Sequence, residues 1–328
     1  MVMTSSGPSI RAPATAPPGR RLETSTAAVR VSFTWLGVRK TLSPGQKAQA
    51  AQTFNAEGRY LSAAKKLLDT RHPAFQAVTA IRGRILSLWR GLSLPFPDPG
   101  IRLIRRDQIE MFNEQMTGLQ QDLAQAVEAL DRQYDEMRQD ARQRLGELYN
   151  GGDYPPGLRG LFEVTWEFPS VEPPAYLLQL NPELFAQERQ RIAARFDEAV
   201  MLAEQAFSSE FAKLVAHLTE RLSGEGVEGK AQVFRDSAVT NLREFFERFK
   251  NLNVHSNPEL DHLVEVAQQA VQGISAQDLR DRGTLRTQVV AELGQVQSVL
   301  DTLLVDRPRR KILRPSPRVG PASAQAVA

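Results

Sequence analysis

The chain has 328 residues, with 41 basic side chains, 38 acidic side chains and no cysteine. A chain of this length can bury a core without cross-links, and the missing cysteines exclude disulfides, thiolate zinc sites, iron–sulfur clusters and a cysteine nucleophile. No run of about 18 apolar residues occurs, and residues 1–26 lack the apolar core of a signal peptide. We therefore expect a soluble cytoplasmic protein that does not enter a membrane.

The formal net charge of +3 is unevenly distributed along the chain. Residues 1–30 carry +3 and residues 306–318 carry +5, which leaves −5 for the residues between them. The basic character is therefore assigned to the two ends. What the ends bind becomes a separate question from what the body binds.

Both ends are predicted to be disordered. Residues 1–26 are rich in Ser, Thr, Ala, Pro and Arg and have almost no large apolar side chain, so they cannot offset the entropy of ordering. Residues 306–328 contain four prolines, which prevent regular structure. The residues between, 27–305, are expected to form one helical domain.

Alternation of apolar and polar side chains predicts three short strands. Val29, Val31, Phe33 and Trp35 alternate with polar residues, and the same pattern recurs over residues 162–168. Residues 101–104 form a weaker candidate. A few short strands cannot be stable alone, so we expect a small sheet packed on helices.

Helices are predicted in the first third of the chain from caps and apolar stripes. Ser43 and Pro44 suit a helix start, and this helix is expected to break near Gly58 and to resume to Leu68. A second helix is predicted over residues 73–92, where apolar side chains follow a single stripe.

Two long helices are predicted over residues 108–149 and 182–222. Asp107 is the expected N-cap of the first, whose apolar residues recur at steps of three or four without interruption. Asn181 and Pro182 form the expected start of the second, and glycines follow its end. Three more helices are predicted over residues 236–252, 257–272 and 284–305.

Each long helix has one narrow apolar face, so each is the expected partner of the other. The predicted fold class is mainly α (α+β), with a long antiparallel helix pair of coiled-coil type on a small base of helices and a short antiparallel sheet. Pairing of the helices with a second copy of the chain remains the alternative.

A metal site and a cofactor site are not favoured. His255, Glu259, His262 and Glu265 lie within eleven residues, but their spacing lets ligands converge only loosely, and a solvated helix face is the preferred interpretation. The motifs GxGxxG, GxSxG and HExxH and the Walker loop are absent. No catalytic residue, cofactor or metal is therefore predicted.

Asp153, Tyr154 and Trp166 belong to the most conspicuous irregular segment. They are candidates to line a ligand pocket. The structural alternative is that Pro155, Pro156 and an aromatic side chain simply turn the chain from helix to strand, and this alternative is preferred.

A basic run near the C-terminal end is a candidate contact for nucleic acid, because several cations can neutralise phosphates. It lacks interleaved aromatic residues, so stacking on bases is not indicated, and a solvated tail is the alternative. A membrane contact is disfavoured by the absence of an amphipathic pattern. The candidate residues are Arg307, Arg309, Arg310, Lys311 and Arg314.

Two segments carry a resemblance to a known family: RLGELYN followed by DYPP within residues 144–156, and FRDSA followed by NLREF within residues 234–245. They resemble a family of uncharacterised bacterial and phage proteins with a domain of unknown function, over roughly residues 28–272. The resemblance implies a helical domain encoded by bacteria or their mobile elements, sometimes near genes for AAA-type ATPases. It implies no catalytic residues.

Two functions are therefore predicted as alternatives. The first is a non-enzymatic structural or interaction protein that presents a long helical arm to a protein partner or to a second copy. The second is a nucleic-acid-associated factor of a phage or mobile element that acts through the basic tails. An enzyme without a familiar motif is a third possibility.

Overall fold

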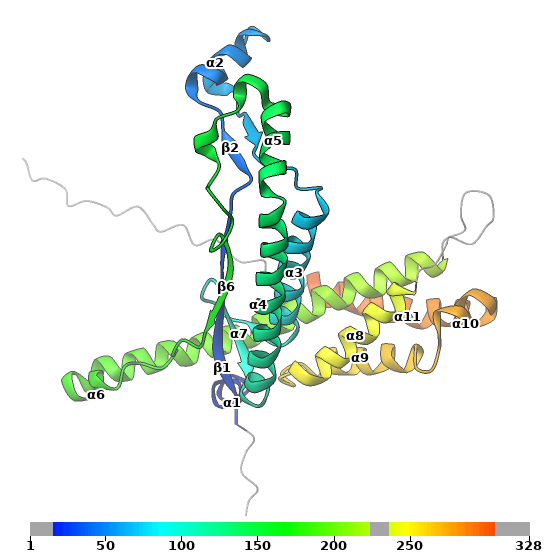
Figure 1. Ribbon diagram of the computed structural model, residues 1–328. Coiled ribbons are helices and arrows are strands. Elements are labelled where there is room, and N and C mark those ends of the chain that lie inside the picture. The colour runs from blue at the N-terminus through cyan, green and yellow to red at the C-terminus, as the bar shows by residue number, and fades with distance from the viewer. Residues whose placement is uncertain (1–15, 224–235, 306–328) are drawn as a thin grey trace, which may run out of the picture. The chain divides into compact units, whose positions relative to one another are not determined.

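The computed structural model describes residues 16–223 and 236–305 (Figure 1). Within them the chain forms two compact units. Unit 1 comprises residues 16–206 and 247–257, and unit 2 comprises the described residues of 207–246 and 258–305. Most of the described residues are helical, and unit 1 also contains a small antiparallel sheet. The prediction of a mainly α fold with a short antiparallel sheet is confirmed.

The sheet of unit 1 has four strands in the order β4–β5–β1–β6. All three neighbouring pairs are antiparallel, and in the central strand Val31 lies opposite Trp166 of the edge strand β6. The three strands predicted from alternation are present, and the short strand β4 was missed. Their bounds are β1 Thr26–Trp35, β4 Ser93–Pro95, β5 Ile101–Arg105 and β6 Phe162–Glu167.

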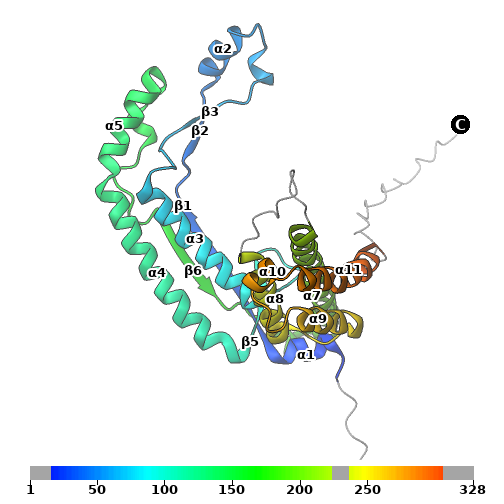
Figure 2. The ribbon, with the colours of Figure 1, turned by 90° about the vertical axis from the view of Figure 1, so that its right-hand side faces the viewer.

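Helices α3 (Pro73–Gly91) and α4 (Ile109–Arg132) pack side by side, and α4 also contacts β6 (Figures 1 and 2). The apolar stripe of α4 is buried in a core that it shares with α3 and with strands β1 and β6, and this core contains no residue of the second long helix. The predicted pairing of the two long helices is therefore corrected. A single apolar face indicates that a helix is buried, but it does not identify the surface that buries it.

The first long helix is interrupted once. Helix α4 ends at Arg132, and α5 (Tyr134–Leu145) follows Gln133, whose N–H bonds to the Leu130 carbonyl at 3.0 Å. The 3-10 turns η3 (Gly146–Leu148) and η4 (Gly151–Asp153) follow α5. The residue before α4 is Gln108, not Asp107. Asp107 lies in the 3-10 turn η2 (Arg106–Gln108), where its carboxylate binds the side chain of Arg105.

Helix α1 (Pro18–Ser25) lies within the segment predicted to be disordered. Pro18 provides a preorganised first turn, and Leu22 is buried. Arg21 donates a hydrogen bond to the Val254 carbonyl at 2.6 Å. These contacts with residues far away in the sequence order a segment whose composition alone indicates disorder. Residues 1–15 lie outside the described part of the chain.

Residues 36–72 leave the sheet and return to α3. Strands β2 (Arg39–Thr41) and β3 (Ala64–Lys66) pair in antiparallel fashion, and α2 (Pro44–Gln52) and the 3-10 turn η1 (Gly58–Tyr60) lie between them. The predicted start of α2 is confirmed by a capping box in which the Ser43 side chain accepts from the Gln46 N–H. The helix does not resume to Leu68, because β3 occupies this place.

Helix α7 (Pro182–Ser223) has the predicted bounds within one residue, and the Asn181 side chain accepts from the Leu184 N–H at 3.0 Å. Its residues up to Ala206 belong to unit 1, where Phe196 packs edge-to-face on Phe96. From Phe207 onward the helix belongs to unit 2.

Unit 2 is built from helices around an aromatic cluster. Phe211 of α7 stacks on Phe245 of α8 with ring centroids 5.1 Å apart, and Phe246 approaches the Phe211 ring edge-on. Helix α10 was not predicted, whereas α8, α9 and α11 match the predicted ranges within two residues. The bounds are α8 Ser237–Leu252, α9 Pro258–Ala270, α10 Ala276–Asp281 and α11 Gly283–Val305.

Within residues 16–223 and 236–305, none of the helices combines the length and the apolar composition that crossing a bilayer requires.

Candidate functional sites

Asp153, one of the predicted pocket residues, joins two lysines of the β2–β3 ribbon. Its Oδ1 lies 2.5 Å from the Lys40 Nζ and its Oδ2 lies 2.6 Å from the Lys65 Nζ. Lys65 also donates to the Leu148 carbonyl at 2.6 Å, so its ammonium group has two acceptors. The Asp153 side chain is 3% exposed, and that of Lys65 is 6% exposed. Asp153 therefore fixes the ribbon to the turns that follow α5.

Tyr154 points into the molecule and is 7% exposed. Its ring stacks on Tyr149 with centroids 5.1 Å apart, and burial raises the pKa of its hydroxyl. The neighbouring Tyr134 hydroxyl donates to the Pro155 carbonyl at 3.1 Å, and burial raises the pKa of Tyr134 to about 12. Tyr134 and Tyr154 are buried members of the unit 1 core, and Tyr149 packs against it.

Trp166 of β6 has a different partner. Its indole Nε1 donates to the Asn113 Oδ1 of α4 at 2.7 Å. The three predicted pocket residues thus make three separate sets of contacts: Asp153 with lysines, Tyr154 with Tyr149, and Trp166 with α4. Each contact joins segments of unit 1.

The pKa of Asp153 makes its contribution testable. Hydrogen bonds from Lys40 and then Lys65 hold the pKa of this carboxyl below its usual value of 3.8. A carboxyl with a lowered folded-state pKa stabilises the fold fully above the unfolded-state pKa, and the contribution is lost as the pH falls through the folded-state value. We expect Asp153→Asn to destabilise unit 1 at pH 7 and to differ less from the wild type at pH 3. Chemical denaturation followed by tryptophan fluorescence at both pH values measures this difference.

Glu147→Gln serves as the control for this substitution, because it removes the same charge from an exposed residue of the adjacent turn η3. An equal loss of stability in the two variants, or a deficit of Asp153→Asn that stays the same at pH 3, would show that the lysine contacts do not carry the effect.

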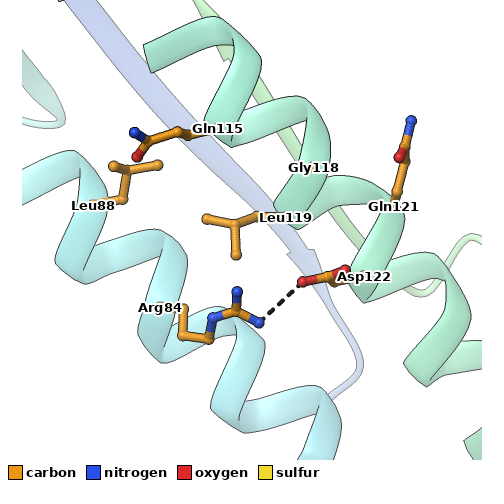
Figure 3. A pocket seen from close by; sticks show the side chains of 7 residues that line it. All are labelled: Arg84, Leu88, Gln115, Gly118, Leu119, Gln121 and Asp122. Carbon is orange, nitrogen blue, oxygen red and sulfur yellow. Dashed lines mark hydrogen bonds and ion pairs between the residues drawn. The ribbon is translucent and has the colours of Figure 1, made fainter. Parts of the chain in front are cut away.

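A shallow hollow of about 430 Å³ lies between α3 and α4 (Figure 3). Gly118 leaves space there, and an added Cβ at this position would meet no atom within 4 Å. The guanidinium of Arg84 and the carboxylate of Asp122 bind each other across the hollow at 3.0 Å. These charged groups satisfy one another rather than converge on a ligand, so the hollow is not assigned a substrate.

The remaining predicted candidates are not assembled into a site. In residues 16–223 and 236–305, no group of three His, Asp or Glu side chains is arranged to hold a metal ion, and His255 and His262 belong to no such group. The basic residues Arg307, Arg309, Arg310, Lys311 and Arg314 lie outside the described part of the chain.

An exposed apolar segment precedes and begins α7. It consists of α6 (Tyr176–Leu180) and the first residues of α7, and we call residues 176–184 the apolar segment. Four of the ten exposed large apolar side chains in the described residues lie within these nine positions. They are Tyr176, Leu178, Leu180 and Leu184, which are 60%, 53%, 76% and 38% exposed.

The apolar segment receives little support from the rest of unit 1. The first buried residue of α7 is Ile192, so its first ten residues contain none. The apolar segment was not predicted, because the prediction of the second long helix rested on its cap and on the apolar stripe that runs from Phe185 to Leu222. A usable signal was present, because the leucines before Asn181 do not belong to that stripe.

The chain was also compared with known proteins. No protein-family model, no curated protein and no solved structure matches it.

Proposed function

We propose that the protein is a non-enzymatic structural or interaction protein, and that the apolar segment docks a protein partner or a second copy of the chain. The observation that carries the proposal is the concentration of four exposed large apolar side chains in residues 176–184. Exposed apolar side chains that gather in one place mark interaction surfaces, whereas single ones scattered over a surface do not.

The lack of packing at the start of α7 supports this assignment. Short helical segments without packing are only marginally stable in water, and the first ten residues of α7 have no buried residue of their own. A partner would cover the leucines and supply the missing packing. The proposal also includes a cytoplasmic location and an origin in bacteria or their mobile elements, which the resemblance of the sequence implies.

The decisive variant replaces two leucines by charged residues. Leu178→Asp combined with Leu180→Asp adds two carboxylates to the centre of the apolar segment without touching the core, since both side chains are more than half exposed. We expect the variant to remain folded and to lose an association that the wild type shows. Light scattering after size exclusion detects self-association, and affinity purification followed by mass spectrometry detects other protein partners.

Met201→Asp is the matched control. Met201 lies on α7 and is 59% exposed, but it lies outside the apolar segment. A self-association or a partner that disappears with the leucine variant and persists with Met201→Asp supports the proposal. The proposal fails if every association of the wild type survives the leucine substitutions.

The second candidate is a nucleic-acid-associated factor that uses the basic tails. It is favoured by the charge of +5 over residues 306–318, and cations of this number would make binding depend on salt. Removing residues 307–328 and measuring DNA affinity at several salt concentrations tests it. Unchanged affinity would exclude the C-terminal tail as the binding element.

A further inference from the structure

A second basic region lies inside the body of the chain. We call residues 39–66 the basic ribbon; they comprise β2, α2, η1 and β3. The ribbon carries six cations and a single acid, Glu57, which gives a net charge of +5. Residues 31–305 together carry −5, so the remainder of that range carries −10. The cations are therefore concentrated in a body that is otherwise acidic. They are Arg39, Lys40, Lys47, Arg59, Lys65 and Lys66.

The register of the ribbon places like charges opposite each other. Lys40 is paired with Lys65, and Arg39 is paired with Lys66. Directly opposed like charges destabilise a two-stranded sheet unless an anion lies between or beside them. Asp153 binds both lysines of the first pair. For Arg39 and Lys66, no ion pair is present within the described residues.

The two cation pairs face opposite sides of the ribbon. Side chains alternate between the faces of a strand, and Lys65 is buried against Leu148 and Asp153. Arg39 and Lys66 therefore lie on the outward face, and both are exposed. Arg39 and Lys66 are therefore accessible on one face of the strands, while Asp153 binds the lysines of the other face.

The basic ribbon also carries two exposed aromatic side chains. Phe54 and Tyr60 are each 79% exposed, more than the other exposed large apolar side chains of the described residues. The Arg59 guanidinium lies 4.9 Å from the centroid of the Tyr60 ring. Figures 1 and 2 both show α2 at the end of unit 1 opposite to α1.

The side chains of the basic ribbon suit some polyanionic ligands better than others. Exposed aromatic rings among cations suit unpaired bases, which stack on the rings while the cations contact phosphates. A lipid surface requires an apolar helix face, but the apolar side chains of α2 are all alanine, and Ala51 is its buried residue. Paired bases in a duplex offer no free face for stacking.

We propose that the basic ribbon binds single-stranded nucleic acid. Arg39 and Lys66 contact phosphates, Phe54 and Tyr60 stack on bases, and the Asp153 contact with Lys40 and Lys65 holds the ribbon in position. This function is independent of the docking function of the apolar segment and of the basic tails.

Fluorescence anisotropy with a labelled oligothymidylate and the full-length chain tests the proposal. We expect Phe54→Ala and Tyr60→Ala each to weaken binding roughly tenfold. Arg39→Ala combined with Lys66→Ala should lower the slope of log affinity against log salt by about 1.4, at about 0.7 for each lost phosphate contact. Because all four side chains are exposed, circular dichroism should remain that of the wild type.

The matched control is Arg189→Ala combined with Lys213→Ala, which removes the same charge from exposed residues of α7. It should leave the affinity and the salt slope close to those of the wild type. The proposal is overturned if the control and the Arg39 and Lys66 variant lose equal affinity, or if no oligonucleotide binds.

Three other probes separate the remaining polyanions: a duplex of the same length, vesicles that contain phosphatidylserine, and an oligoglutamate peptide. Weaker binding of each than of the single strand is the expected result. If the ribbon variants lose affinity for vesicles or for the peptide but keep it for the single strand, the assignment to nucleic acid is wrong.

Discussion

Phe112→Ala is expected to lower the free energy of unfolding of unit 1 by about 3–5 kcal/mol, the usual cost of removing a buried phenyl ring. Phe112 lies on α4 and has no exposed surface. Its ring packs edge-to-face against Phe168, with centroids 6.4 Å apart, beyond the end of β6. Truncation would leave a cavity between the helix and the sheet, where rigid elements limit collapse.

Tryptophan fluorescence reports this change selectively. The chain has three tryptophans, at positions 35, 89 and 166, and all of them belong to unit 1. The adjacent residue provides a control, because Met111 is 37% exposed and Met111→Ala should change the free energy of unfolding by less than about 0.5 kcal/mol. Equal midpoints of denaturation for the two variants would contradict the assignment of Phe112 to the core.

The sequence predicted those elements that are determined by neighbouring residues, such as an alternating strand or a helix cap. The alternation over residues 29–35 reflects a strand with two different faces, and β1 has these bounds extended by three residues at its start. Asn181 and Pro182 predicted the start of α7 because a cap is a property of adjacent residues. The capping box at Ser43 is predictable for the same reason.

Features that depend on distant residues were missed or misplaced. Leu22 orders α1 through burial, and the composition of the segment does not reveal that burial. Strands β2 and β3 are three residues long and highly charged, so they show no alternation. The stripe of α4 predicted a buried helix correctly, but it could not distinguish a partner helix from the α3 and sheet surface that covers it.

In the candidate sites, too, the features that depend on distant residues could not be predicted. Asp153 was recognised as unusual, but its partner Lys40 lies 113 residues away in the sequence, so its role as an anchor of the ribbon was not predictable. Summing the charge over the body concealed the +5 of residues 39–66 within a total of −5. A charge count in short windows would have revealed the ribbon, although not the opposition of Arg39 and Lys66 across its strands.

Phe211→Ala is expected to lower the free energy of unfolding of unit 2 by about 3–5 kcal/mol. Phe211 lies on α7, has no exposed surface, and contacts both Phe245 and Phe246 of α8. Its near-parallel stack on Phe245, with 6° between the ring planes, would be lost together with the edge contact to Phe246. Aromatic pairs add stability beyond the area that they bury.

Unit 2 contains no tryptophan, so tryptophan fluorescence reports on unit 1 alone, whereas helical circular dichroism reports on both units. Each unit has its own core, and we therefore expect Phe211→Ala to shift part of the helical circular dichroism to lower denaturant while the tryptophan transition stays in place. Val299→Ala, at a residue of α11 that is 38% exposed, should shift neither signal measurably. If the tryptophan transition moves together with the circular dichroism, the long helix α7 couples the two cores into one cooperative unit, and the expectation of independent unfolding is wrong.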